Sequence, residues 1–213
     1  MSVVPSNQRM SSFTKLTFFL LAVLCTSIAA AQNVIINGDF DDPPYDTIGA
    51  VSGWTVTGSV GAVGDEGFTT PDHAAAFSLG GNSDGNMLSQ SFATIPGQAY
   101  TLDFDAGVYG IRSLGPLQLQ IQVTGTGTLL TETVIPPYNG NFNPAPFDHF
   151  MFSFIADSAS ATLKFNDIGL GNNAADIILD TVSVAAIPEP TSLVLVMVGA
   201  VPLLGYIRRR RFG

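Results

Sequence analysis

Residues 117–123 read Leu-Gln-Leu-Gln-Ile-Gln-Val, a run in which apolar side chains and glutamines alternate without a break. Residues 99–105, Ala-Tyr-Thr-Leu-Asp-Phe-Asp, alternate in the same way. Successive side chains of a β-strand point to opposite faces of its sheet, so a period of two predicts strands with one buried and one solvent-facing side. These two runs decide the fold class, because they require sheets that are buried on one face only.

The same pattern recurs along the rest of the chain. Further runs of this kind are 34–36, 54–56, 74–79, 88–92, 129–135, 150–154, 163–165 and 177–184, the last with a slip near Asp180. Turn clusters rich in glycine, proline and asparagine separate them, and no long window before the C-terminal tail supports an amphipathic helix. Roughly ten short strands, each with one buried face, predict an all-β domain built as an antiparallel β-sandwich.

The first 31 residues have the three parts of a secretory signal peptide. Arg9 and Lys15 supply a basic region, residues 16–24 form an apolar core, and Ala29 and Ala31 form an A-x-A cleavage site. The alternative is an N-terminal membrane helix, for which the apolar core is too short. A cleaved signal helix followed by an exported domain is therefore expected.

Residues 32–187 are expected to form that domain. They contain 16 acidic residues against only two basic ones, Arg112 and Lys164, a formal net charge of −14. Such a field repels nucleic acid and anionic lipid, and it favours cations, above all Ca²⁺, whose ligands are oxygens. The only cysteine, Cys25, lies in the signal peptide. The mature domain must therefore be held by its core or by bound ions rather than by disulfides.

Residues 188–213 form a three-part tail. Pro188, Glu189 and Pro190 come first, and an uncharged apolar run of 17 residues, 191–207, follows. The final part is the basic cluster made of Arg208, Arg209, Arg210 and Arg211. As a helix the apolar run would extend about 25 Å, the short end of what crosses a bilayer. The positive-inside bias would hold the arginines on the cytoplasmic side of this transmembrane helix.

This order of motif, apolar segment and basic cluster resembles the PEP-CTERM sorting signal of Gram-negative bacteria. The resemblance implies an anchor in the inner membrane and cleavage by an exosortase-type transpeptidase, in bacteria that make an exopolysaccharide matrix. The protein would then be exported, held at the inner membrane before processing, and moved to the cell surface or the extracellular matrix. The alternative is a plain single-pass anchor, which needs only length and charge.

The domain opens with Asn-Gly-Asp-Phe-Asp at 37–41 and closes with Ile-Leu-Asp-Thr-Val-Ser-Val at 178–184. With Gly-Trp at 53–54 and the runs at 88–92 and 97–104 between them, this order resembles the galactose-binding-like jelly roll of many carbohydrate-binding modules and plant cell-wall proteins. The resemblance implies that the opening and closing segments lie side by side, and that Asp41 and Asp180, with Asp39, help to bind a structural Ca²⁺. The alternative is that all three are ordinary carboxylates at turns and strand ends.

Four side chains are candidates for contact with a sugar: Trp54, Tyr109, Arg112 and Tyr138. Trp54 can stack on a sugar ring, or it can fill the core, which is the commoner place for a large aromatic side chain. Tyr109 beside Arg112, and Tyr138, are expected in loops, and loops carry function more often than strands do.

The sequence contains no convincing catalytic constellation. Asp103 and Asp105 share one strand face about 7 Å apart, as paired carboxylates of a glycosidase do, but such residues usually only solvate an exposed face. His73 and His149 lack metal-ligand spacing, and Gly-Asn-Ser-Asp-Gly at 81–85 is a turn without the strand and helix of a nucleophile elbow. We expect a non-enzymatic exported protein that binds or structures extracellular polysaccharide. A polysaccharide hydrolase and a purely structural surface protein are the alternatives.

Overall fold

The computed structural model describes residues 32–64, 73–77, 85–110, 116–140, 145–169 and 175–188. The expected signal peptide and its cleavage site lie outside these ranges, as does the tail from Glu189 onward with its four arginines. Pro188 is exposed at the end of the last described range. No described segment forms a helix long and apolar enough to cross a membrane.

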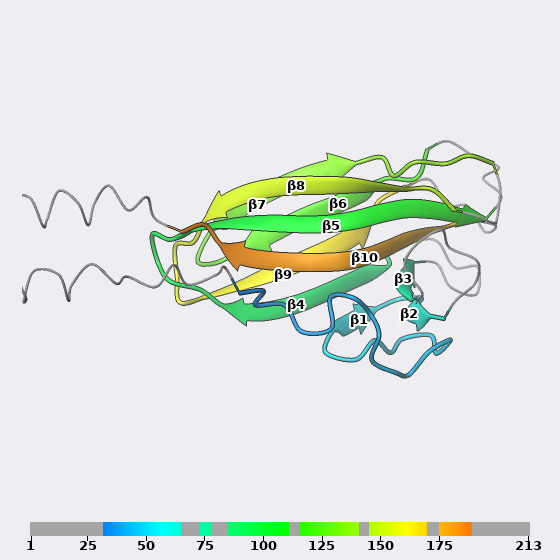
Figure 1. Cartoon of the computed structure of the whole chain (residues 1–213), viewed down its shortest axis with the longest axis horizontal. Coiled ribbons are helices and arrows are strands. Elements are labelled where there is room, and N and C mark those ends of the chain that lie inside the picture. The colour runs from blue at the N-terminus through cyan, green and yellow to red at the C-terminus, as the bar shows by residue number, and fades with distance from the viewer. Residues whose placement is uncertain are drawn as a thin grey trace, which may run out of the picture. The chain divides into compact units, whose positions relative to one another are not determined.

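The described residues form ten strands, which are labelled in Figure 1. They are Thr55–Thr57 (β1), Val60–Val63 (β2), Ala74–Phe77 (β3), Met87–Ala93 (β4), Ala99–Gly110 (β5), Leu119–Thr124 (β6), Thr128–Val134 (β7), Phe147–Ile155 (β8), Ser160–Asp167 (β9) and Ala175–Ala186 (β10).

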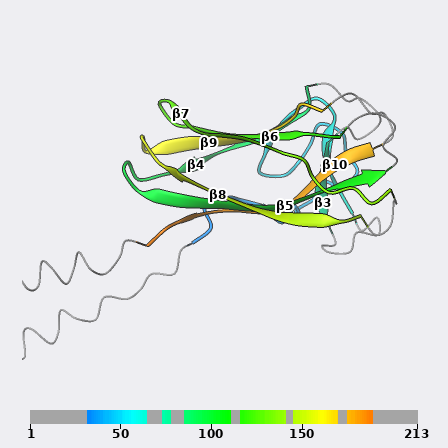
Figure 2. The ribbon, with the colours of Figure 1, turned by 90° about the horizontal axis from the view of Figure 1, so that it is seen from above.

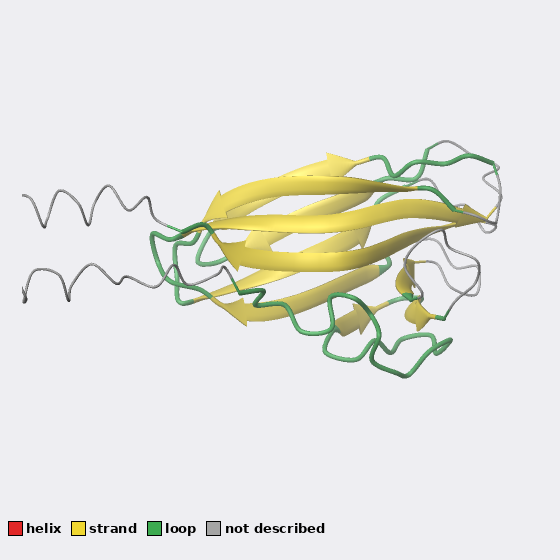
Figure 3. Ribbon diagram, viewed as in Figure 1, coloured by secondary structure: helices red, strands yellow, loops and turns green. Residues whose placement is uncertain are grey.

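These strands make two five-stranded sheets, in the orders β1-β4-β9-β6-β7 and β2-β3-β10-β5-β8. All pairings between these strands are antiparallel. Figure 2 shows the sheets as two layers, and in Figure 3 the described part of the chain consists of strands and loops without a helix. The predicted antiparallel β-sandwich is confirmed.

The alternation in the sequence sets which side chains enter the core. In β6, Leu119, Ile121 and Val123 are fully buried, while the glutamines between them are partly exposed. The predicted slip near Asp180 is a β-bulge, because the register of β10 against β5 shifts between Asp180 and Ser183. A bulge adds one residue to one strand of a pair. The apolar residues on both sides of this one therefore still face the core.

The strands of the structure differ from the predicted ones in several places. β2 was not anticipated, because its sequence Val-Gly-Ala-Val is buried on both faces and shows no alternation with polar residues. Residues 34–36 form no strand, and only Asn33 makes an isolated bridge, to Ala185. β5 continues five residues beyond the predicted end at residue 105, to Gly110.

Aromatic side chains join the two sheets in the core. Phe104 of β5 meets Phe165 of β9 edge to face, with ring centroids 5.1 Å apart, and stacks on Phe150 at 5.4 Å. Trp54 lies 6.3 Å from Phe165 and 5.7 Å from Phe40. Burying a large apolar side chain stabilises a fold by about 1.5–3 kcal/mol, so this cluster, rather than a disulfide, accounts for the cohesion of the described domain.

The opening segment of the domain, residues 33–40, ties one sheet to the other. The Val34 N–H donates to the Val184 carbonyl at 2.9 Å, and the Val182 N–H donates to the Gly38 carbonyl at 2.8 Å. On its other side, the Ile36 N–H donates to the Gln90 side-chain oxygen of β4 at 2.8 Å. Gly38 is required here, since a Cβ would lie against the Val182 carbonyl oxygen. The opening and closing segments therefore lie side by side, as the jelly-roll resemblance implies.

Candidate functional site

Four aspartates lie on the outer face of the sheet that contains β5 and β10: Asp103, Asp105, Asp176 and Asp180. They alternate along their strands with core residues such as Leu102 and Phe104, which are completely buried. We call these four residues the acidic face. Three of them retain some exposure to solvent, but Asp180 is completely buried.

Asp180 is an unusual carboxylate because it is buried without compensation. Neither of its oxygens has a hydrogen-bond partner within the described structure. Burial raises the pKa of Asp180 to about 8, and the charges of Asp105, Asp39 and Asp41 add to the rise. The Thr181 backbone N–H opposes part of this increase, although it does not reach hydrogen-bond geometry with either oxygen. Leaving a buried polar group unsatisfied costs about 1–3 kcal/mol. A proton or a bound cation at Asp180 would therefore stabilise the folded state.

The surroundings of Asp180 fit a cation in part. Asp39, Asp41 and Asp105 are near enough to raise its pKa, and carboxylate and carbonyl oxygens are the ligands that Ca²⁺ takes. However, in the described ranges no three acidic, histidine or cysteine side chains converge as a ligand set. Backbone carbonyls or water would have to complete the coordination. If an ion binds here, Asp180 is the residue whose environment fits best, with exposed Asp39 and Asp41 beside it.

Both histidines of the chain pair with aspartates around this position. His149 on β8 lies opposite Asp105 in the sheet register, and its Nδ1 is 2.8 Å from Asp105 Oδ1. The Nε2 of His149 is 3.7 Å from Asp103 Oδ1, and the Thr181 hydroxyl donates to Asp105 Oδ2 at 2.6 Å. The two carboxylates that the strand period placed on one face are thus bridged by a histidine from the neighbouring strand.

The second histidine, His73, belongs to a smaller cluster. Its Nδ1 is 3.0 Å from Asp41 Oδ1, and its ring stacks on Tyr45 with centroids 4.4 Å apart. The Tyr45 hydroxyl donates to the Asp41 carbonyl oxygen. Asp41 is therefore engaged with His73 through one oxygen, which leaves the other for an additional partner.

The outer face of the other sheet has a different character. Its outward side chains are Thr55 and Thr57 of β1, Met87, Ser89 and Ser91 of β4, Thr162, Lys164 and Asn166 of β9, Gln120, Gln122 and Thr124 of β6, and Thr131 and Thr133 of β7. We call this set the neutral face. It contains hydroxyls, amides, one methionine and one lysine. The two acidic residues on these strands, Glu132 and Asp167, pair with inward-facing Ile121 and Leu119 and so belong to the opposite side.

The amides of the neutral face are available for a ligand. Gln120, Gln122 and Asn166 make no side-chain hydrogen bond with any described residue, whereas Ser91 and Thr162 bond to each other at 2.8 Å. Gln120 and Gln122 follow one another on β6, and Asn166 lies beside Gln120 on β9. An amide both donates and accepts hydrogen bonds, as a sugar hydroxyl does. The arrangement suits a ligand rich in hydroxyl groups that lies across the strands.

The structure places Trp54 in the core. Only 8% of its surface is exposed, its indole N–H donates to the Asn37 carbonyl at 2.9 Å, and its ring packs on Phe40 and Phe165. Of the two roles considered for Trp54, this burial favours the core residue over the sugar platform. The hydrophobic effect decides this, since a large aromatic ring gains most where both faces are covered.

The other three sugar candidates are not gathered into one described site. Tyr109 lies within β5 rather than in a loop, half-buried against a small outer cluster that includes Ile178 and Phe147. Tyr138 does lie in a loop, half-buried against the main core. The Val108 N–H donates to the Pro137 carbonyl at 3.1 Å, which brings that loop against the end of β5. Arg112 and the 81–84 turn lie outside the described residues.

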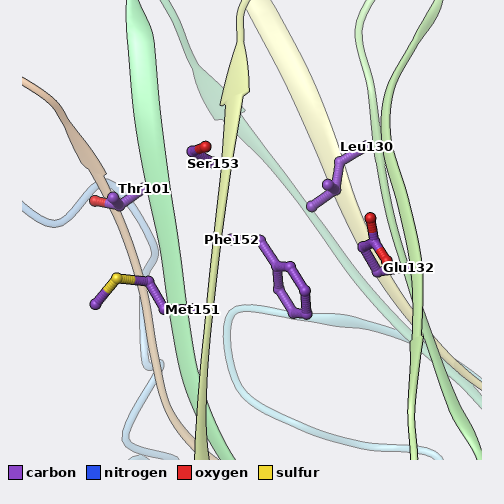
Figure 4. Close-up of a pocket in the computed structure, with 6 residues that line it drawn as sticks. All are labelled: Thr101, Leu130, Glu132, Met151, Phe152 and Ser153. Atoms are coloured by element: carbon purple, nitrogen blue, oxygen red, sulfur yellow. The ribbon is translucent and has the colours of Figure 1, made fainter.

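A shallow groove follows the free edges of β7 and β8, which end the two sheets on the same side. It has a volume of about 530 Å³ and is lined by Thr101, Leu130, Glu132, Met151, Phe152 and Ser153. Figure 4 shows Phe152, Leu130 and Glu132 on one side of the β8 strand and Thr101 and Met151 on the other. The lining residues wrap around an edge strand and do not converge on one point, so the groove provides no enclosed site.

Sequence reasoning missed the neutral face and the role of His149. The alternation of β6 pointed to its outward glutamines, but nothing local indicated which strands would lie beside them. His149 is exposed, and its pairing with Asp103 and Asp105 depends on the register of β8 against β5, which no local pattern gives. The one signal in the sequence was the excess of acidic over basic residues, which makes a face without acidic residues unusual.

Comparison with solved structures relates this sandwich to proteins of carbohydrate chemistry. The arabinose-bound MgGH51 α-L-arabinofuranosidase matches with a TM-score of 0.53 and 11% identity, over 72% of this chain and 26% of that one. TmCBM61 in complex with β-1,4-galactotriose matches with a TM-score of 0.50 and 15% identity, over 73% of this chain and 99% of that one. The chain thus spans about a quarter of the arabinofuranosidase and corresponds to the whole of the binding module. At these identities the likeness concerns the fold, and it confirms the expected resemblance to carbohydrate-binding modules at that level.

No curated protein matches the chain in sequence. A family model does match, over residues 33–185, and its description is "Protein of unknown function (DUF642)". The match begins in the segment that joins the two sheets and ends within β10, so it spans the sandwich. Since it covers well over half of the 213 residues, the chain belongs to the DUF642 family.

Proposed function

We propose that this DUF642 chain is an exported, non-enzymatic protein that binds extracellular polysaccharide through its neutral face. The observation that carries the proposal is the contrast in charge: the domain has a formal net charge of −14, yet no described acidic side chain lies on this broad sheet face. That face presents Gln120, Gln122 and Asn166, whose side chains have no hydrogen-bond partner among the described residues. Sugar recognition requires groups that both donate and accept hydrogen bonds, and amides do both.

The similarity to TmCBM61, described in complex with β-1,4-galactotriose, supports the same proposal at the level of the fold. The flanking sequences support the location. A signal peptide at 1–31 and a tail that resembles PEP-CTERM at 188–213 would deliver the domain across the inner membrane to an exosortase-type transpeptidase. Function at the cell surface or in the matrix follows from that route.

Binding is tested with the purified full-length chain, kept in a detergent without a sugar headgroup. The chain is applied to a panel of neutral and acidic polysaccharides. The double variant Gln120→Ala/Gln122→Ala should lose about tenfold in affinity, because a net hydrogen bond contributes about 0.5–1.5 kcal/mol. The matched control is Thr101→Ala/Ser153→Ala, on the outer face of the other sheet. Failure to bind any polysaccharide, or equal binding by the neutral-face variant, would overturn the proposal.

The sorting route has its own test. Mass spectrometry of the protein recovered from its own cells should find a chain that begins at Gln32 and ends near Pro188. A surface-exposed chain that still carries Arg208–Arg211 would favour a plain membrane anchor.

A structural Ca²⁺ is part of the proposal, with Asp180 as the principal carboxylate and Asp41 and Asp39 nearby. Support comes from the complete burial of Asp180 and from its lack of hydrogen-bond partners within the described residues. The ion would supply positive charge to a pocket that otherwise has to take up a proton. With their carboxylates bound to the ion, Asp180, Asp41 and Asp39 would hold the opening segment against β10.

A polysaccharide hydrolase is a second candidate function, favoured by one observation. Asp103, Asp105 and His149 form a contiguous polar cluster on an outer face. Turnover of matrix polymer that is lost in Asp103→Asn/Asp105→Asn would establish this activity. Its absence together with polymer binding would leave the binding function alone.

A further inference from the structure

One residue of the neutral face differs from all the others in charge. Lys164 is one of only two basic residues between positions 32 and 187. It lies on β9, the middle strand of the order β1-β4-β9-β6-β7. In the sheet register, Ser89 is its neighbour on one side and Gln122 on the other. The lysine therefore stands near the centre of the face and not at its rim.

No described carboxylate neutralises Lys164. It makes no ion pair or hydrogen bond with any described residue, although the domain holds 16 acidic side chains. Nor does it protect an exposed sheet edge, which is a common role of lysine in strands, because β9 is hydrogen-bonded on both sides. The usual structural explanations for a strand lysine are thus absent here.

The described outward side chains around this positive charge are uncharged. Two strands flank β9 on each side, and strands lie about 4.8 Å apart, so uncharged side chains extend for about 10 Å in both directions. At physiological ionic strength the screening length is about 8 Å. A ligand anion on Lys164 would therefore experience the local cation more strongly than the negative charge of the distant acidic face.

We infer that the polysaccharide bound by the neutral face is acidic, and that Lys164 binds the carboxylate of a uronic acid unit. This inference rests on the proposed function and adds the class of polymer to it. Two amide side chains next to Lys164, Gln122 on β6 and Asn166 two residues along β9, are placed to bond the hydroxyls of the same and adjoining units. Lys164 offers one charge-assisted contact to one unit of the polymer, whereas nucleic-acid binding relies on several basic side chains that neutralise several phosphates at once.

The test compares polymers that differ only in the carboxylate. Oligosaccharides of galacturonate, glucuronate and mannuronate are each used beside the same oligosaccharide after carboxyl reduction, which converts the acid into a neutral hydroxymethyl group. Binding to the full-length chain is measured by calorimetry in the presence of chelator, so that Ca²⁺ cannot crosslink the acidic forms. At least one acidic form should bind about tenfold more tightly than its reduced partner, the effect of one charge-assisted hydrogen bond.

The variant Lys164→Met keeps the aliphatic length of the side chain and removes its charge. It should abolish the preference by weakening binding of the acidic form only, and Lys164→Arg should restore the preference. Ser153→Glu, on the outer face of the other sheet, changes the net charge in the same direction and should leave the preference intact. Equal binding of acidic and reduced forms, or a preference that survives Lys164→Met, overturns the inference while polysaccharide binding stands. If neither form of any oligosaccharide binds, the proposed function fails together with it.

Discussion

The two outer faces of the sandwich are made from the same kind of strand but carry opposite chemistry. One face has four aspartates, one of them completely buried, and a histidine bridging two others. The other has hydroxyls and amides around one lysine, and no acidic residue among its described outward side chains. Four of the 16 acidic residues of the domain lie on the acidic face, and none of the described ones lies on the neutral face. The comparison teaches that two sheets with the same alternation can differ in chemistry through the residues at their outward positions.

The faces also differ in how much of them is covered. Other parts of the chain lie on the acidic face: the Pro146 carbonyl closely approaches Gly107, and Ala145 packs with Ile178. The segment around Gly38 bonds to β10 next to the bulge that holds Asp180. On the neutral face, the central amides have no described partner. The acidic face therefore contributes to the architecture, and the neutral face is the one proposed for recognition.

The largest expected effect concerns Asp180 and the pH. Its folded pKa, about 8, lies above the ordinary value of 3.8, so between these limits the folded state binds more protons than the unfolded one. Without a bound cation, the contribution of Asp180 to the free energy of unfolding should be greatest below pH 4. It should fall as the pH rises towards 8. The slope is at most about 1.4 kcal/mol per pH unit. Chemical denaturation in chelator at pH 5, 6, 7 and 8 measures it.

Two controls accompany that measurement. Asp180→Asn cannot titrate, so its stability should lack this decline. Added Ca²⁺, if it binds, should flatten the slope of the unsubstituted protein and add about 2.7 kcal/mol at 100 times its dissociation constant. A slope unchanged by Asp180→Asn would show that Asp180 is not the buried titrating group, and a midpoint indifferent to Ca²⁺ would remove the ion from the proposal.

A second prediction tests whether the acidic face is truly covered. In Gly107→Ala the new Cβ would lie against the Pro146 carbonyl oxygen, well inside van der Waals distance, so backbone must shift. Overpacking of this kind costs about 1–3 kcal/mol, to be measured by denaturant unfolding. Gly64→Ala is the matched control, because no atom lies near its added methyl group. Equal stability of the two variants would contradict the packing of the 145–146 segment on this sheet.

A third prediction concerns a variant that places a negative charge on the neutral face. In Gln122→Glu a carboxylate is placed directly opposite Lys164 in the sheet register. A cross-strand pair of opposite charge stabilises a sheet by about 0.2–1 kcal/mol, so unfolding should be unchanged or slightly harder. Binding of acidic polysaccharide should nevertheless fall about tenfold or more, because Lys164 is now neutralised. Titration of immobilised polymer measures this loss, and undiminished binding would separate Lys164 from recognition.

The smallest effect is expected at Asp157, an exposed carboxylate with the opposite surroundings to Asp180. The Thr126 hydroxyl and backbone N–H, the Gly127 N–H and the Ser158 hydroxyl all donate to it, and they lower its pKa. The stability that the ionised Asp157 contributes is present above the unfolded pKa of about 4, and it is lost as the pH falls below that value. The difference in melting temperature between the protein and Asp157→Asn should therefore shrink from pH 5 to pH 2. A difference in melting temperature that does not change with pH would show that Asp157 stabilises the fold through its shape and not through its charge.

Much of the fold could be predicted from the sequence, since a period of two is a local property. The alternation of 117–123 and 99–105 predicted β6 and β5 and their buried faces, and the slip near Asp180 appeared as a bulge. β2 was not predictable in this way, because burial on both faces removes the polar residues that mark a period. The jelly-roll resemblance directed attention to Asp180, but it could not show that both carboxylate oxygens are buried without partners.

The sequence by itself determined that the domain is made of half-buried strands, that it is strongly acidic, and that its flanks resemble export and sorting signals. Only the tertiary structure decided which strands share a sheet, and with that the separation of acid from amide and the position of Lys164 on the middle strand. The physical reason is the range of the interactions. Side-chain alternation acts between neighbours in the chain, whereas strand order and register are set by contacts between residues far apart in sequence.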